Sequence, residues 1–204
     1  LVLPELDIKG KPAFRDRKIY GSVEFMDYES RHRFNARNKD TTQTSAEYGF
    51  GVKFGSPNNC HTFYYYSKDW QDAHPEYLAM NEKGERVRSV NGSGPGQICL
   101  TSPGTRKSML EKLRQYIVAD RKKAVKEGSP FPIIYCIEAN DNNLTCQCPE
   151  CQALIKREGA NSGAYIDLVN SLADGIKDEF PDVLLDTFAY LQTLDPPKTI
   201  RAKD

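Results

Sequence analysis

The stretch from Pro130 to Cys151, PFPIIYCIEANDNNLTCQCPEC, constrains the fold more than any other part of the chain. Its apolar run, Phe131 to Ile137, has the length and β-branched content of a buried parallel strand. In α/β folds, ligands and catalytic groups gather where the carboxyl ends of parallel strands open into loops. The run ends at a cluster of polar residues, and a strand that ends in this way predicts a functional site. The cluster consists of Glu138, Asn140, Asp141, Asn142 and Asn143.

Strand and helix patterns alternate on both sides of this stretch. Pro103 follows a hydroxyl cap at Thr101-Ser102 and opens a helical pattern that ends at Gly128. Such a series predicts parallel strands joined by right-handed crossovers. The other predicted elements are a strand within residues 12–27, a loop over 28–46, a short buried strand at 97–100, helices at 153–158 and 162–180, and a buried strand at 183–190.

The predicted fold class is therefore α/β, a (β/α)8 TIM-barrel-like fold forming a single domain over residues 1–204. Four or five strand units can be counted, whereas a complete barrel usually needs about 250 residues, so we expect a partial or excised barrel. A doubly wound sheet is the alternative, although no strand is followed by a G-x-G-x-x-G turn. Because the chain begins without methionine and ends in mid-pattern, we expect further domains in a longer parent chain.

Charge and hydropathy exclude some classes of partner. The chain has 28 basic and 28 acidic residues, a balance that gives no reason to expect nucleic acid. No stretch approaches the roughly 20 apolar residues of a membrane helix, so we expect no membrane span.

The carboxylates after the organising strand suggest glycosidic bond cleavage. Glu138 and Asp141 can converge because the extended backbone ends between them, and two carboxylates suit a general acid and a second acidic group. Asn140 and Asn142 are candidates to bind sugar hydroxyls or an acetamido group. The same residues also suit a loop of Asx-turns. Asp186 is a further candidate carboxylate outside this stretch, although its place within a predicted buried strand argues first for a structural role.

Aromatic residues supply candidate sugar contacts. His61 lies at the edge of the run Phe63–Tyr66, and aromatic faces beside polar tips are what sugar rings pack against. The alternative is that this run is a strand with alternating core and surface positions. Tyr190, at the end of the last strand, is a further candidate for sugar contact.

Three cysteines follow the organising strand within six residues. Thiolates at this spacing, Cys146, Cys148 and Cys151, can bind one tetrahedral zinc with a fourth ligand from elsewhere, for which Cys99 and His61 are the candidates. We prefer a structural zinc at Cys99, Cys146, Cys148 and Cys151 to a catalytic zinc with an open position. A disulfide between two of the three is a third possibility if the protein is secreted.

The motifs in this order resemble a known family: NCHTFYYY, HPEYLAM, GQICLTSP, IEANDN, CQCPECQAL and FPDVLLDTFAY. Over roughly Cys60 to Lys198 the chain resembles the bacterial domain of unknown function family 4838, found in large, mostly extracytoplasmic proteins that look like glycoside hydrolases. The resemblance implies a glycoside-hydrolase-like barrel, a carbohydrate substrate and an extracytoplasmic location, but no established reaction.

A more distant resemblance is to the β-N-acetylhexosaminidases, whose fourth strand ends in an Asp-Glu pair. Against that motif, Asn140-Asp141 takes the place of the pair. The resemblance implies that Asp141 is the acid and Asn140 holds the acetamido group. An amide replaces the family's first carboxylate, so substrate-assisted catalysis is in doubt. The alternatives to a hydrolase with Glu138 and Asp141 are a non-catalytic carbohydrate-binding barrel and a metal-dependent hydrolase.

Overall fold

The computed structural model describes residues 54–203. These residues belong to the second of the two units into which the chain divides, Leu1–Val52 and Lys53–Asp204. The strand predicted within residues 12–27 and the loop predicted over 28–46 lie outside the described residues.

Two short parallel strands form the centre of the second unit. Strand β3 (Ile134–Cys136) pairs with β4 (Leu184–Asp186), with Tyr135 opposite Leu185. Phe54 forms a parallel bridge with Ile134, so β3 has a parallel neighbour on each side. The strand is buried throughout, as the apolar run predicted. Both strands are shorter than predicted, because the paired residues run only from Ile134 to Cys136 and from Leu184 to Asp186.

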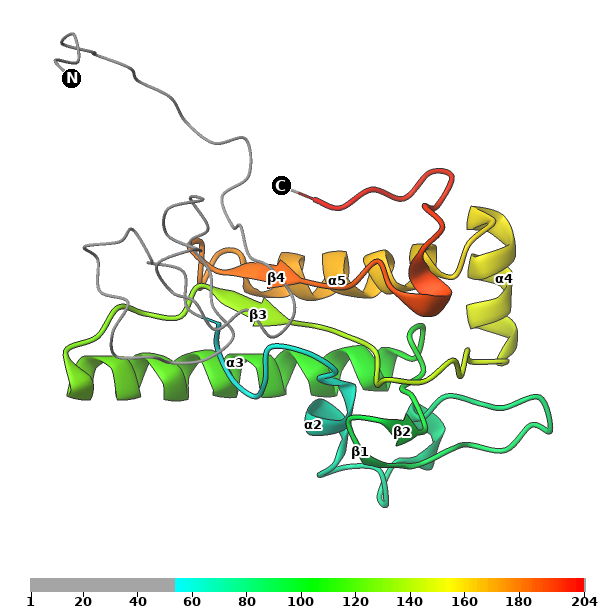
Figure 1. Cartoon of the computed structure of the whole chain (residues 1–204), viewed down its shortest axis with the longest axis horizontal. Helices are drawn as coiled ribbons and strands as arrows, with labels where there is room; N and C mark the ends of the chain where they lie inside the picture. The colour runs from blue at the N-terminus through cyan, green and yellow to red at the C-terminus, as the bar shows by residue number, and fades with distance from the viewer. Residues whose placement is uncertain (1–53, 204) are drawn as a thin grey trace, which may run out of the picture. The chain divides into compact units, whose positions relative to one another are not determined.

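Two amphipathic helices run alongside these strands, as Figure 1 shows. Helix α3 (Pro103–Glu127) begins where Ser102 accepts a hydrogen bond from the backbone N–H of Thr105, and it ends at Gly128 with a left-handed φ of 62°. Helix α5 (Ser162–Ile176) packs against α3. Their buried faces make much of the core: Met109, Leu113 and Ile117 from α3, and Leu168, Leu172 and Ile176 from α5.

The described part of the chain is therefore a mixed α/β unit. Phe54, β3 and β4 are parallel neighbours in chain order, with α3 before β3 and α5 before β4. This succession is expected of consecutive barrel units and of a doubly wound sheet alike. Closure into a (β/α)8 barrel stays a prediction. Among the described helices, none combines the length and apolar character needed to cross a membrane.

An excursion between Phe54 and α3 carries helix α2 (Phe63–Ser67), the 3₁₀ turn η2 (Pro75–Tyr77) and the antiparallel strands β1 (Ser89–Asn91) and β2 (Gly94–Pro95).

One strand prediction in this excursion is wrong, and one alternative left open by the sequence is excluded. The aromatic run Phe63–Tyr66, for which a strand was the alternative, lies in helix α2, and Glu138 O accepts from the N–H groups of Thr62 and Phe63 at its start. Residues 97–100 are buried but form only an antiparallel bridge from Ile98 to Leu78.

A buried carboxylate ties the C-terminal segment to helix α4 (Pro149–Glu158). Glu158 has an exposed fraction of 0 %, and its carboxylate accepts hydrogen bonds from the backbone N–H groups of Thr199 and Ile200 at 2.9 and 3.0 Å. Thr199 Oγ1 donates to the same carboxylate. Hydrogen bonds from Ile200 and Thr199 lower the pKa of Glu158 from 4.5 to about 2.

Replacing Glu158 by glutamine removes this charge, and we expect a lower urea midpoint of unfolding at pH 7. The folded-state pKa lies below the ordinary value of 4.5. The carboxylate's contribution is therefore fully present above about pH 4.5, and it is lost as the pH falls toward 2. Urea unfolding measured from pH 7 down to pH 3 checks this. The matched control is Glu111→Gln, at an exposed position of α3. A Glu158→Gln deficit that stays constant across this range would contradict the assignment.

Candidate functional site

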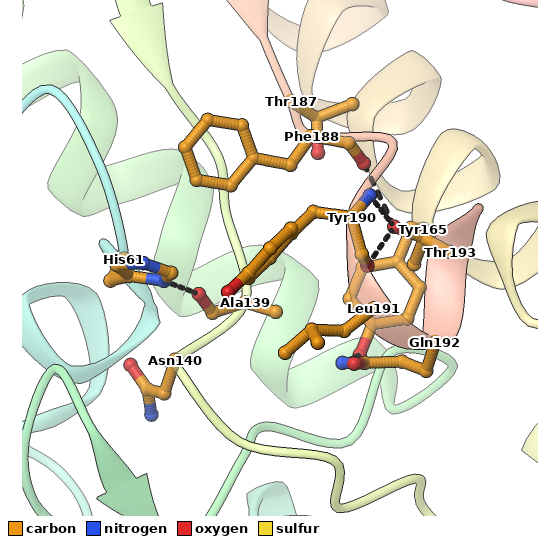
Figure 2. Close-up of a pocket in the computed structure, with 10 residues that line it drawn as sticks. All are labelled: His61, Ala139, Asn140, Tyr165, Thr187, Phe188, Tyr190, Leu191, Gln192 and Thr193. Carbon is orange, nitrogen blue, oxygen red and sulfur yellow. Dashed lines mark hydrogen bonds between the residues drawn. The ribbon is translucent and has the colours of Figure 1, made fainter. Parts of the chain in front are cut away.

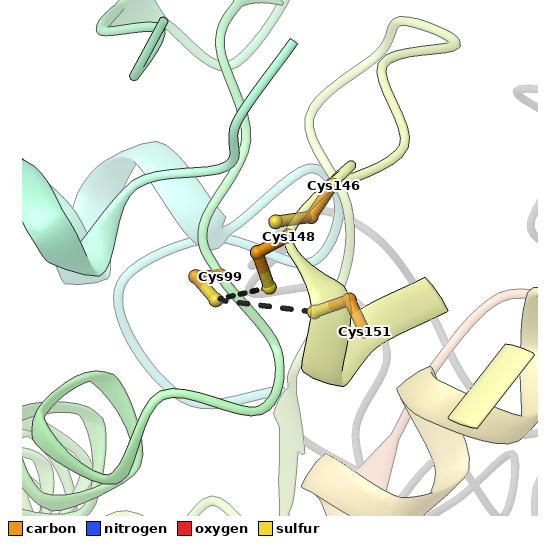
Figure 3. Close-up of side chains that lie close together, drawn as sticks. All are labelled: Cys99, Cys146, Cys148 and Cys151. Atoms are coloured by element: carbon orange, nitrogen blue, oxygen red, sulfur yellow. Dashed lines mark hydrogen bonds between the residues drawn. The ribbon is translucent and has the colours of Figure 1, made fainter. Parts of the chain in front are cut away.

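Four buried cysteine side chains converge between the excursion and helix α4 (Figure 3). Cys146 and Cys148 come from the loop after β3, Cys151 from the first turn of α4, and Cys99 from the segment before α3. Their four Sγ atoms all lie within 4.8 Å of one another. The sulfur of Cys99 lies 3.6 Å from that of Cys148 and 3.9 Å from that of Cys151. The structure thus brings together the four residues predicted as metal ligands.

The geometry of this cluster suits a metal ion. With zinc–sulfur bonds of about 2.3 Å, the edge of a ZnS₄ tetrahedron is about 3.8 Å, close to the separations of the Cys99 sulfur from those of Cys148 and Cys151. Thr101 Oγ1 lies 3.2 Å from the Cys151 sulfur, and the backbone N–H of Met80 donates to the Cys146 sulfur at 3.3 Å. Such outer donors stabilise metal-bound thiolates. The cluster can therefore hold a metal ion.

Without a cation, these thiols cannot all ionise. Hydrogen bonding with Cys146 and Cys151 holds the pKa of the Cys99 thiol far below its ordinary value. The interactions with Cys146 and Cys99, together with burial, raise the pKa of Cys151 well above its ordinary value. One thiolate therefore suppresses ionisation of its neighbours, and four thiolates together need a positive charge among them.

Glu138, directly after β3, anchors the start of the excursion. Its side chain has an exposed fraction of 0 %, and its Oε2 accepts a hydrogen bond from the backbone N–H of His61 at 3.0 Å. Its backbone N–H and C=O both bond to residues 62–63. The predicted second carboxylate therefore lies behind His61 and positions its backbone.

His61 connects the two predicted carboxylates. Its Nδ1 lies 2.9 Å from the carbonyl oxygen of Ala139, and because a carbonyl only accepts, Nδ1 carries the proton. The other ring nitrogen, Nε2, lies 3.9 Å from Oδ1 of Asp141, whose side chain is 45 % exposed. Asp141 thus lies at the solvent side of the imidazole, and Glu138 lies at its backbone.

The two predicted asparagines form hydrogen bonds within the protein. The Asn140 amide accepts from the N–H of Tyr64 at 2.8 Å and donates to Ser89 Oγ and Gly96 O at 3.0 and 2.9 Å. Asn142 accepts from Gln97 and from the N–H of Leu144, and its Nδ2 donates to backbone carbonyls at Ser93 and Gly96. Both amides fasten the loop after β3 to the excursion, and their predicted contact with sugar stays a prediction.

A small pocket lies beyond the ends of β3 and β4 (Figure 2). Three rings on its wall contact one another: His61 and Phe188 at 5.6 Å, Phe188 and Tyr190 at 6.0 Å, and His61 and Tyr190 at 6.3 Å between centroids. Two of these rings, His61 and Tyr190, were predicted to contact sugar. Residues that line the pocket include His61, Tyr165, Phe188, Tyr190, Leu191 and Gln192.

The backbone is strained on both sides of this pocket. His61 and Leu191 have φ values of 49° and 50°, and both line the pocket. They are the non-glycine residues with positive φ among residues 54–203. Such strain persists where the surrounding structure fixes it, and it concentrates at functional sites.

Sequence reasoning missed part of this region. Phe188, Tyr165 and Gln192 were not predicted as site residues, and the fold brings them together from the segment after β4, from α5 and from the turn η3 (Leu191–Thr193). Asp186 was predicted as an outside carboxylate with a structural role. One of its oxygens lies within 4.8 Å of a Glu138 oxygen and of the Cys136 sulfur. The register of the parallel strands explains why Asp186 joins Cys136 and Glu138, because Asp186 lies opposite Cys136 in the ladder.

Asn140→Asp should destabilise the protein by about 3 kcal/mol, because an oxygen would replace the amide that donates to Ser89 and Gly96 O. Urea unfolding at pH 7 measures this. The control is Asn143→Asp, an exposed position in the same loop, which should change stability by less than about 0.5 kcal/mol. Equal stabilities of the two variants would contradict the structural role of the Asn140 amide.

Comparison with known proteins gives a family for the chain. No curated protein and no solved structure matches it. The family model described as Domain of unknown function (DUF4838) matches residues 1–204. Since the match covers the whole sequence, the chain belongs to this family, as its motifs indicated.

Proposed function

We propose that the pocket beyond β3 and β4 binds a sugar ring and that the protein hydrolyses a glycosidic bond there, with Asp141 as general acid. One observation carries the proposal: the exposed Asp141 carboxylate lies 3.9 Å from Nε2 of His61, whose ring forms part of an aromatic pocket wall. Aromatic faces bind the apolar faces of sugar rings, and a carboxyl group can protonate the leaving oxygen.

In this proposal the other groups have distinct tasks. Tyr190 and Phe188 provide ring faces, and Tyr190 is 47 % exposed and so is accessible from solvent. His61 holds its Nε2 toward Asp141 because Nδ1 donates to Ala139 O. Glu138 positions the His61 backbone, and its carboxylate lies near that of Asp186. The (β/α) barrel, the carbohydrate substrate, further domains and an extracytoplasmic location belong to the same proposal.

A second candidate function is carbohydrate binding without cleavage. It is favoured by the burial of Glu138, whose carboxylate is engaged by the His61 backbone. A second carboxylate in a hydrolase would normally face the scissile bond from about 5–9.5 Å away from the acid. The two candidates differ in whether the wild-type protein turns over any glycoside that it binds.

We also propose that Cys99, Cys146, Cys148 and Cys151 bind a structural zinc. The support is a set of four buried thiols whose sulfur atoms all lie within 4.8 Å of one another, a donor set that zinc takes in structural sites. Bound zinc would cross-link the loop after β3 to the segment before α3. A catalytic zinc at this cluster is disfavoured, because four protein ligands leave no position for water.

Asp141→Asn should lower kcat on a cleaved 4-nitrophenyl glycoside by about 10²–10⁴-fold while leaving binding of an unreactive methyl glycoside unchanged. The loss follows from removing the proton donor without altering the pocket wall. The control is Asp178→Asn, an exposed aspartate that follows helix α5. Full activity of Asp141→Asn would remove Asp141 from the mechanism. Glycoside binding by the wild-type protein with no turnover would favour the second candidate.

Elemental analysis of protein purified without chelator should find one zinc per chain, and Cys148→Ser should lose it and melt at a lower temperature. The metal-bound fold loses a ligand that a serine hydroxyl replaces poorly. The control is Cys60→Ser, because the Cys60 sulfur is outside the four-cysteine cluster. Absence of metal together with a lowered free-thiol count would instead identify a disulfide.

A further inference from the structure

Tyr165 and Gln192 form a polar pair in the wall of the pocket, away from His61 (Figure 2). Gln192 Nε2 donates to the Tyr165 hydroxyl at 3.2 Å. The Tyr165 ring stacks on Phe63, with centroids 6.0 Å apart and planes within 6° of parallel. Tyr165 is only 4 % exposed, so its hydroxyl is held in place by core packing. The pair is therefore a fixed feature of the wall.

This pair has hydrogen-bonding capacity that the described chain does not use. Gln192 Oε1 is buried and has no hydrogen-bond partner within residues 54–203. Turning the amide over would leave its NH₂ group without a partner instead, so either orientation leaves one buried polar group without a partner among the described residues. The Tyr165 hydroxyl accepts from Gln192 and keeps its own proton to donate. The wall thus offers one acceptor and one donor side by side.

The pair stays uncharged at ordinary pH. Burial raises the pKa of Tyr165 to about 12, so its hydroxyl remains a neutral donor. Among the described residues that line the pocket there is no lysine or arginine. A ligand carboxylate would therefore find no permanently charged cation among the described residues of this wall.

We propose that Tyr165 and Gln192 form a recognition subsite for a hydroxyl group of a neutral sugar ring, and that the pocket discriminates against rings that carry a carboxylate. A sugar hydroxyl both donates and accepts, so it can satisfy Gln192 Oε1 and the Tyr165 proton at once. The aromatic side chains of the pocket contact the face of the sugar ring, while Tyr165 and Gln192 bind a hydroxyl group at the edge of that ring. The inference rests on the proposed carbohydrate site and adds the substrate class.

The test measures binding of methyl glycosides to the full chain by protein-observed NMR titration. Neutral methyl glucoside, galactoside and mannoside are each compared with the matching glucuronide, galacturonide and mannuronide. We expect the neutral member that binds most tightly to bind at least tenfold more tightly than its uronide. Gln192→Leu and Tyr165→Phe should each weaken that binding about tenfold. The control is Gln115→Leu at an exposed position of α3.

Thermal melting accompanies each titration, and Tyr165→Phe keeps the packed ring if Gln192→Leu does not fold. Uronides that bind as tightly as neutral glycosides would overturn the inference, as would variants that bind like the wild-type protein. In both of those cases glycoside binding itself, and so the proposed site, would stand. Failure of every glycoside of either kind to bind would overturn the proposed carbohydrate site as well.

Discussion

The polar backbone that follows β3 is the constraint on which the rest of the unit depends. Once the chain leaves the ladder at Cys136, its buried N–H and C=O groups need new partners. The excursion supplies them: Thr62 Oγ1 donates to Cys136 O, and Glu138 O accepts from Thr62 and Phe63. Gln97 then bonds to both the N–H and the C=O of Asn140. The excursion is therefore fastened to the strand end by satisfied buried hydrogen bonds.

The cysteine cluster fastens the same loop at its other end. Residues 141–148 have no regular secondary structure, yet Cys146 and Cys148 meet Cys99 in a buried cluster. Between the two attachments lies Asp141, whose N–H donates to Gly92 O at 2.7 Å. Hydrogen bonds near one end and the cysteine cluster at the other thus attach the loop that carries Asp141, the residue proposed as general acid.

Features of the fold that depend on neighbouring residues could be predicted from the sequence, whereas contacts between distant segments could not. The cap at Ser102 and the stop at Gly128 are confirmed because each signal lies within a few residues of the helix end that it marks. The sequence left open whether Phe63–Tyr66 is a strand, because four consecutive aromatic residues have no distinguishing period. The cysteine spacing indicated a ligand set, whereas Tyr165 and Gln192 meet only through the packing of α5 beside η3. Long-range placement of ordinary residues leaves no mark in a single sequence.

The two non-glycine residues with positive φ in the described part of the chain, His61 and Leu191, lie in the wall of the proposed binding pocket. His61 is held at positive φ by the Glu138 carboxylate on its N–H and by Ala139 O on its ring. Leu191, at φ 50°, begins the turn η3, which Thr193 closes by donating its N–H to Tyr190 O at 3.0 Å. In each case neighbouring hydrogen bonds fix the conformation and so offset the strain. The aromatic wall and the Gln192 amide are therefore held in place by the protein's own contacts. A preorganised wall avoids ordering costs on binding, so this rigidity supports the ligand site that we propose.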